Sequence, residues 1–185
     1  GTGNGADVNL TVKDTFILDN SRISNRVDSI TDSVATGNAG NINIDTGFLQ
    51  MSNGSRLTAR NSDIGNPGNI NINADTVSLD TSNINAGVIF GNAGNVNLKA
   101  RGSVSLENES NIFASVQRGD GKAGNILIDA KSLLLNNRSL IGGIKGNSAN
   151  PTGSAGNITV KTDDSLTLNN SSRISASAFT GSGGD

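Results

Sequence analysis

The stretch ATGNAGNINIDT, residues 35–46, places two glycines and three asparagines around an alternating Ile-Asn-Ile. Related phrases return as NPGNINI at 66–72, NAGNVNL at 92–98, KAGNILI at 122–128 and SAGNITV at 154–160. The glycine before each Asn-Ile pair stands at Gly40, Gly68, Gly94, Gly124 and Gly156, and Gly5 opens a weaker first copy, GADVNL. Self-similarity at a period of roughly 30 residues indicates a solenoid or a related repeat array.

Each repeat contains three short segments in which every second residue is apolar, the period of a strand with one buried face. The first segments contribute Val8/Leu10, Ile42/Ile44, Ile70/Ile72, Val96/Leu98, Ile126/Ile128 and Ile158/Val160. The second segments contribute Phe16/Leu18, Leu49/Met51, Val77/Leu79, Val104/Leu106, Leu133/Leu135 and Leu166/Leu168. The third segments contribute Ile23/Asn25, Leu57/Ala59, Ile84/Ala86, Ile112/Ala114, Leu140/Gly142 and Ile174/Ala176.

These columns predict an all-β fold, a right-handed parallel β-helix with three sides, about six coils and three short strands per coil. Equivalent strands would stack in parallel about 4.8 Å apart, and parallel crossovers overwhelmingly take the right hand. Helical repeats are excluded by the Asn, Gly and Ser inside every unit, and a propeller blade needs about 40–45 residues and four strands. We expect residues 1–185 to form one β-helix segment excised from a longer array.

The repeated glycine ends the segment of each unit that varies most in length and sequence. This segment is NRVDSITDSVATGNAG at 25–40 but only GVIFGNAG at 87–94. Insertions are therefore expected to leave the rod at one edge. We interpret the glycine as a corner that takes a positive φ and packs closely against the coil above. The asparagine after it is expected to hydrogen-bond amide to amide along the axis, although a row of solvated asparagines is the alternative. This predicted ladder comprises Asn41, Asn69, Asn95, Asn125 and Asn157.

The amino-acid composition disfavours several classes of function. Only 16% of the residues are charged and the net charge is −2, which disfavours nucleic acid as a partner because phosphates require clustered Lys and Arg. Cys is absent, so neither disulfides nor thiolate metal ligands are available. No apolar run approaches membrane-spanning length, and membrane insertion is not expected.

The phrase G-N-[IV]-x-[ILV], followed by S-[LV]-x-L and S-x-I-x-A, resembles the repeats of cyanobacterial filamentous-haemagglutinin-like exoproteins. The resemblance covers residues 5–185 and rests on several copies of one motif. It implies an extracellular or cell-surface β-helical stalk with an adhesin role, exported by two-partner secretion through an outer-membrane transporter. The amino-terminal secretion domain typical of that family is not visible in this sequence.

Some right-handed β-helices are polysaccharide-active enzymes, which use a pair of carboxylates at a defined separation. The outward positions after the first segments are instead Thr11, Asp45, Asn73, Lys99, Asp129 and Lys161. Their alternating charges fit a structural ladder across coils. The chain has no His for general base work and no Tyr or Trp to stack on sugars. We therefore expect no enzymatic activity, no catalytic residue, no metal site and no cofactor.

Two features could form a contact surface. Arg118, Gly119 and Asp120 make a tripeptide that integrins recognise in animal matrix proteins, although Gly-Asp is common in loops of this composition. The fifth coil also carries apolar residues, Leu127, Leu134 and Ile141, at positions expected to face outward, with Phe113 beside them in the fourth coil. A long loop folding over Ile141 and Phe113 is the alternative.

The sequence thus favours a structural or adhesive stalk that displays loops on one edge. A glycan-binding or self-associating module is the alternative, with a cell-surface or glycan ligand, and a polysaccharide-active enzyme is less favoured. Terminal coils expose unpaired strand edges, so copies are expected to stack end to end.

Overall fold

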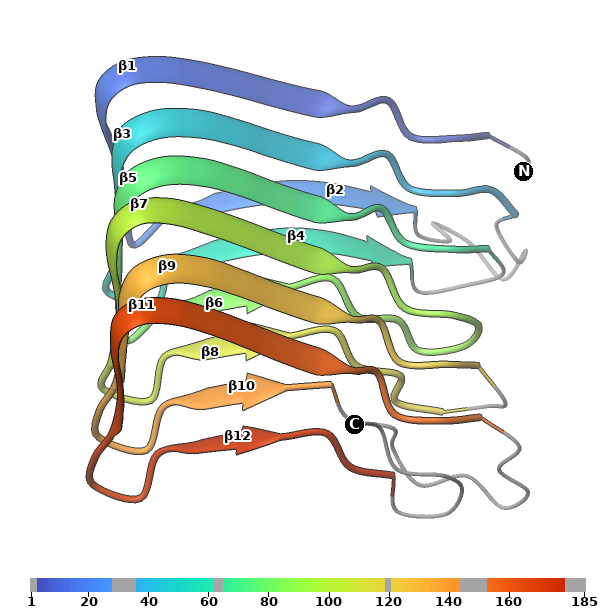
Figure 1. The fold of residues 1–185 in the computed structure, drawn as a ribbon. Helices are drawn as coiled ribbons and strands as arrows, with labels where there is room; N and C mark the ends of the chain where they lie inside the picture. The colour runs from blue at the N-terminus through green and yellow to red at the C-terminus, as the bar shows by residue number, and fades with distance from the viewer. Residues whose placement is uncertain (1–2, 28–35, 62–64, 119–120, 144–152, 179–185) are drawn as a thin grey trace.

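A computed structural model describes residues 3–27, 36–61, 65–118, 121–143 and 153–178. The described chain is all-β and winds as a right-handed parallel β-helix, with two six-stranded sheets facing each other (Figure 1). The first sheet consists of β1 (Val8–Asp19), β3 (Ile42–Ser52), β5 (Ile70–Asp80), β7 (Val96–Glu107), β9 (Ile126–Leu135) and β11 (Ile158–Leu168). The second consists of β2 (Arg22–Val27), β4 (Arg56–Asn61), β6 (Asn83–Asn85), β8 (Asn111–Phe113), β10 (Leu140–Gly142) and β12 (Arg173–Ser175).

The predicted apolar columns are in register on adjacent coils. Ile42 pairs with Val8 and Ile70, and Ile126 pairs with Val96 and Ile158. The inward side chains of both sheets form a single core in which Ile42, Ile70 and Val96 are fully buried. Like side chains therefore stack along the axis, and burying them supplies the main favourable free energy of folding. The predicted parallel β-helix is confirmed.

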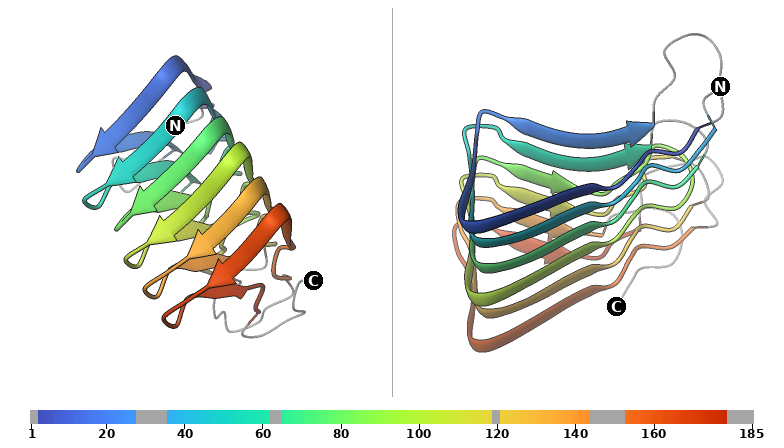
Figure 2. Two further views of the ribbon diagram at one scale, coloured as in Figure 1. Left: turned by 60° about the vertical axis from the view of Figure 1, so that its left-hand side comes forward. Right: turned by 90° about the horizontal axis from the view of Figure 1, so that it is seen from above.

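The number of strands per coil differs from the prediction. The first and second predicted segments form one long bent strand, so each coil contains two strands and not three. The bend carries a register irregularity in four of the five strand pairs of this sheet, for example between Val12 and Thr15. A one-residue difference in length at this corner is thus absorbed as a bulge while the ladder continues on both sides. Figure 2 shows the bent strands on one side of the coil and the short strands opposite.

The corner glycines allow neighbouring coils to approach closely, but not through the expected backbone conformation. Positive φ values occur at other glycines, such as Gly54 and Gly91, and not at Gly94 or Gly124. A Cβ on Gly94 would lie 2.1 Å from the carbonyl oxygen of Gly68, closer than any real contact. The absence of a side chain, and not the left-handed region, is what this corner requires. In the first coil Ala6 occupies the place assigned to Gly5, because Ala6 is the residue that contacts Gly40.

The opposite corner, between each bent strand and the following short strand, depends on polar residues. Asn53, Asn108 and Asn137 have φ values of 54°, 54° and 52°, a conformation that Asn tolerates better than most residues. Each of these asparagines is followed two residues later by an inward serine, and Ser55, Ser82, Ser110 and Ser139 are fully buried. The Ser110 hydroxyl oxygen accepts a hydrogen bond at 3.0 Å from the backbone N–H of Ser82 in the coil above. This serine row supplies partners for buried backbone groups at the corner.

The fifth coil corrects one predicted register. Ile141 pairs with Ile112 and Ile174 and is fully buried, so it belongs to the core and not to an outward contact surface. Leu140, expected in the core, occupies the outward position beside Asn111. The sequence Leu-Ile-Gly-Gly allows either Leu140 or Ile141 to face inward. Because Ser139 is buried in the serine row, the inward residue two positions later is Ile141.

Candidate functional site

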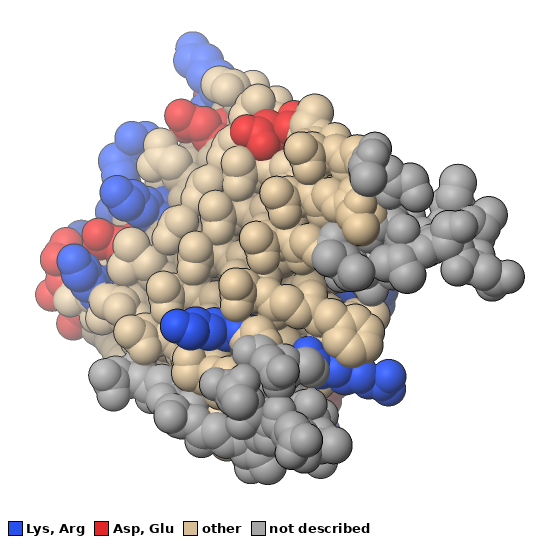
Figure 3. All heavy atoms as spheres, turned by 90° about the vertical axis from the view of Figure 1, so that its right-hand side faces the viewer, with Lys and Arg blue, Asp and Glu red and all other residues tan. Residues whose placement is uncertain are grey.

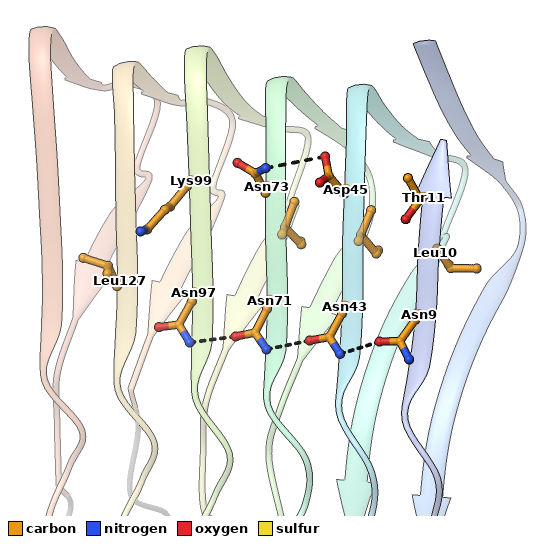
Figure 4. A pocket seen from close by; sticks show the side chains of 12 residues that line it. Asn9, Leu10, Thr11, Asn43, Asp45, Asn71, Asn73, Asn97, Lys99 and Leu127 are labelled. Atoms are coloured by element: carbon orange, nitrogen blue, oxygen red, sulfur yellow. Dashed lines mark hydrogen bonds between the residues drawn. The ribbon is translucent and has the colours of Figure 1, made fainter. Parts of the chain in front are cut away.

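The first halves of the bent strands present two parallel rows of outward side chains, because alternate residues of a strand face the same side. One row is Asn9, Asn43, Asn71, Asn97, Leu127 and Thr159. The other is Thr11, Asp45, Asn73, Lys99, Asp129 and Lys161. An open groove of about 570 Å³ runs between them over the first four coils, with Leu127 at its far end (Figure 4).

The asparagine row of this groove is a continuous amide ladder. The side-chain N–H of Asn43 donates to the side-chain oxygen of Asn9 at 2.7 Å. Asn71 donates to Asn43, and Asn97 to Asn71, each at 2.8 Å (Figure 4). Asn43 and Asn71, inside the row, each use one of their two N–H groups and one oxygen lone pair along the axis, whereas Asn9 only accepts and Asn97 only donates. The remaining donor and acceptor capacity repeats about every 4.8 Å along the groove.

The second row contributes charge without forming ion pairs. Asn73 donates to the Asp45 carboxylate over 3.5 Å, a weak contact. Lys99, Asp129 and Lys161 are neighbours in the register, yet no ion pair joins them in the described structure. The groove therefore offers amides, one lysine and one carboxylate to a ligand, a set that suits hydroxyl groups and other neutral hydrogen-bonding groups.

The groove is poorly equipped for hydrolysis of sugars. Its lining contains the single carboxylate Asp45, whereas glycoside hydrolysis uses two flanking carboxyl groups. Among the described residues no group of three or more His, Cys, Asp or Glu side chains could hold a metal ion.

The predicted asparagine ladder lies at the glycine corner, beside the groove. Asn69 and Asn95 donate their backbone N–H groups, at 2.9 Å each, to the side-chain oxygens of Asn41 and Asn69 in the coil before. Their side-chain N–H groups donate to the same oxygens at 3.3 and 3.1 Å. Asn125 and Asn157 follow the pattern through their backbone N–H groups at 2.8 and 3.0 Å. These asparagines tie successive coils together, and Asp7 takes the asparagine's place in the first coil.

The residues predicted as a contact surface are not brought together. Leu127 ends the groove, whereas Leu134 lies beyond the bend of β9 and Phe113 faces outward from β8 in the second sheet. All three are half-buried. Arg118 is exposed, while Gly119 and Asp120 lie outside the described residues, so the geometry of the tripeptide is not defined.

Sequence reasoning missed the Asn9–Asn97 row of the groove. Its signal was present as the variable position inside G-N-[IV]-x-[ILV], where four successive repeats carry Asn. The apolar columns on either side predict that this residue faces outward, but they do not show that four amides line a groove.

The fold and the groove define a polar-grooved β-solenoid. Comparison with models of known protein families, with curated proteins and with solved structures finds no match to this chain. The described residues include no helix that is long and apolar enough to cross a membrane.

Proposed function

We propose that this chain is a non-enzymatic stalk segment of a secreted or cell-surface protein, a rigid rod that displays the connections between its coils along one edge. The observation that carries the proposal is the continuous pairing of strands in both sheets through all six coils. Each coil is held by backbone ladders, one shared core and stacked polar corners, so the rod has no hinge in its described part. Figure 3 looks onto the edge where the coils are joined, and most described atoms there belong to uncharged residues.

The resemblance to filamentous-haemagglutinin-like repeats supports the cellular side of the proposal, namely an outer surface location, an adhesin role and export by a two-partner outer-membrane transporter. Antibodies against the chain should label intact cells of the source organism. Labelling that appears only after the cells are permeabilised would count against a surface location.

The stalk itself is tested by removing one coil. Deleting residues 68–93 joins two equivalent corners, since Gly68 and Gly94 stack on each other. We expect a folded rod shortened by about 4.8 Å, measured by circular dichroism and small-angle X-ray scattering. Deleting only residues 81–93 removes β6 but keeps β5, and should unfold the chain at the junction. A collapse of the first variant as complete as that of the second would refute a modular rod.

A second candidate function is binding of a neutral glycan in the amide groove. It is favoured by the row of partly satisfied asparagine amides beside a groove of about 570 Å³, within the usual range for ligand sites. Asn71→Leu should abolish such binding, because it removes a central amide. The substitution is structurally conservative, since coil five carries Leu127 in the same row.

Ser78→Leu is the matched control for Asn71→Leu. Coil five carries Leu134 in the row of Ser78, and this row lies beyond the bend, outside the groove. Neutral oligosaccharides that bind both variants as they bind the unaltered chain would rule out the groove as their site.

A further inference from the structure

Four arginines gather on the outer face of the second sheet in its first two coils. Arg22 pairs in register with Arg56, and Arg26 pairs with Arg60. All four alternate with inward residues and face outward, and only Arg60 is partly covered. Paired arginines lie about 4.8 Å apart across the strands and about 13 Å apart along each strand. Ser24 and Thr58 occupy the outward position between them.

This arrangement differs from the other charges of the rod. The ion pairs of the described residues join opposite charges on adjacent coils: Arg101 with Asp75, Lys131 with Asp164 at 3.6 Å, and Arg138 with Glu109 at 3.0 Å. Stacked like charges are instead destabilising by a few tenths of a kcal/mol to about 1 kcal/mol.

Within the described chain, the guanidinium groups of Arg22, Arg56 and Arg60 have no ion-pair partner. Arginine stacks on arginine twice on this face, although the net charge of the chain is −2. An external anion would stabilise the face because it would offset the repulsion between these charges.

Two hollows flank the arginines. At the start of the strands, Arg22 and Arg56 line an open hollow of about 520 Å³ together with Asn20, Ser21 and Gly54. Beyond the end of the strands, a hollow of about 380 Å³ is lined by Arg60, Asn85, Gly87, Val88, Phe113, Ser115, Val116 and Gln117.

The second hollow has the features of a sugar-binding surface. The oxygen of Asn85 accepts a hydrogen bond from the backbone N–H of Gly87 at 2.7 Å, which leaves the Asn85 N–H groups to face a ligand. The ring of Phe113 in the same hollow offers an aromatic face.

We propose that this outer face binds an acidic polysaccharide, with Arg22, Arg56 and Arg60 holding its carboxylate or sulfate groups and the Phe113 hollow receiving a sugar ring. Guanidinium groups hold both anions through paired, charge-assisted hydrogen bonds. The hydroxyl and amide groups between and beside the arginines provide partners for sugar hydroxyls. The site lies on the opposite side of the coil from the amide groove, so it goes beyond the stalk role and does not depend on what the groove binds.

Nucleic acid fits this face less well. A nucleic-acid strand presents a phosphate about every 3.4 Å along the duplex axis, and tight binding requires many cations along its path. Here the basic residues end after two coils, and the next outward residues in the Arg22 row are Asn83, Asn111 and Leu140. A polymer with sparser charges and many hydroxyl groups matches the pattern better.

The test is titration calorimetry of the whole chain with oligogalacturonate, dextran sulfate fragments, neutral dextran and a single-stranded DNA oligonucleotide. We expect binding to at least one of the two acidic glycans, weakened by added salt, whereas any binding of neutral dextran should not depend on the arginines of this face. The two acidic arms distinguish carboxylate from sulfate. Arg22→Gln combined with Arg56→Gln should weaken that binding about tenfold or more, because two charge-assisted contacts are lost.

The control variant combines Arg101→Gln with Lys131→Gln, which removes the same net charge from the other sheet. It should change binding less than about twofold. An equal loss in the control, failure of both acidic glycans to bind at low salt, or tighter binding of DNA through the same arginines would each overturn the proposal.

The urea midpoint of the double Arg22/Arg56 variant adds a check on folding. Because stacked like charges repel, we expect it to match or exceed that of the unaltered chain at low salt. A lower midpoint would assign these arginines a structural role in place of the binding role.

Discussion

At the corner between each bent strand and the next short strand, single polar side chains link one coil to the next. Asn108 donates to Asp80 at 2.7 Å, and Asn137 donates to Asn108 at 2.9 Å. Asn108 and Asn137 hold backbone conformations with positive φ and are hydrogen-bonded to each other. The corner is thus stabilised by hydrogen bonds between coils, and removing a single donor or acceptor should weaken it.

Asp19 begins this corner ladder and gives it a measurable pH dependence. Its carboxylate accepts hydrogen bonds from the Ser52 hydroxyl at 2.8 Å and the Asn53 amide at 2.6 Å, which hold the pKa of Asp19 below its ordinary 3.8. A lowered folded-state pKa means that this contribution to stability is present above pH 3.8 and is lost as the pH falls through the folded-state value. Asn53→Gly, which keeps the positive φ, should raise the pKa of Asp19 in an NMR titration. Asn137→Gly, at the same corner three coils away, should leave it unchanged, and equal shifts would disprove the local origin.

The buried serines predict a larger energetic effect. Ser110→Ala removes the hydroxyl oxygen that accepts from the backbone N–H of the fully buried Ser82, and leaves that N–H without this hydrogen bond. The cost should be about 1–3 kcal/mol of unfolding free energy, measured by urea denaturation. Ser105→Ala, on the half-buried outer side of β7, should change stability by about 0.5 kcal/mol or less. Similar losses at both positions would show that the serine row has no special role.

At the scale of strands, the alternation of apolar and polar residues predicts which side chains face inward and how the strands stack. Inward columns of Ile, Leu and Val repeat in all six coils, so parallel stacking and the core followed from the pattern. The merging of two segments into one bent strand did not, because a one-residue bulge at Val12–Thr15 leaves the same alternation as a break between strands. The stacking of Arg22 on Arg56 follows from the predicted columns, because Ile23 and Leu57 share a column and the arginines precede them.

Coil five shows where alternation alone is ambiguous and where a neighbouring residue resolves it. Ser139 precedes Ile141 by two positions, as Ser110 precedes Ile112, and the pairing of Ile141 with Ile112 follows that spacing. The motif S-x-I-x-A therefore contained the correct register. The predicted outward placement of Ile141 follows from alternation with Leu140 as the inward residue.

The two registers predict opposite outcomes for mutation. Ile141→Ala should lower the unfolding free energy by about 2–5 kcal/mol, because the side chain is fully buried. Leu134→Ala, on the outward side of β9, should cost clearly less, since that side chain is half-buried. Chemical denaturation of the two variants measures both. A milder effect for Ile141 than for Leu134 would contradict the observed register.

At the scale of the whole molecule, stability passes from coil to coil, and within the described residues the sixth coil pairs with a neighbour on one side only. Leu133 and Leu135 in β9 are 1% and 0% exposed, whereas Leu166 and Leu168 occupy the same columns in β11 and are 47% and 41% exposed. β11 and β12 are also edge strands with unpaired backbone groups on one side. Exposed apolar columns at the edge of a sheet favour the stacking of a second copy.

We therefore expect the 185-residue chain to self-associate through this end, with a sedimentation coefficient that rises with protein concentration. Leu166→Lys combined with Leu168→Lys should hold the chain as a monomer, because charges on an open edge oppose stacking. Phe90→Lys is the control: Phe90 is 49% exposed but lies in a connection between coils, so this variant should associate like the unaltered chain. Circular dichroism confirms that each variant is folded before it is compared. A chain that remains monomeric at high concentration would show that this contact does not form. If Phe90→Lys prevents association and the double leucine variant does not, the contact lies elsewhere.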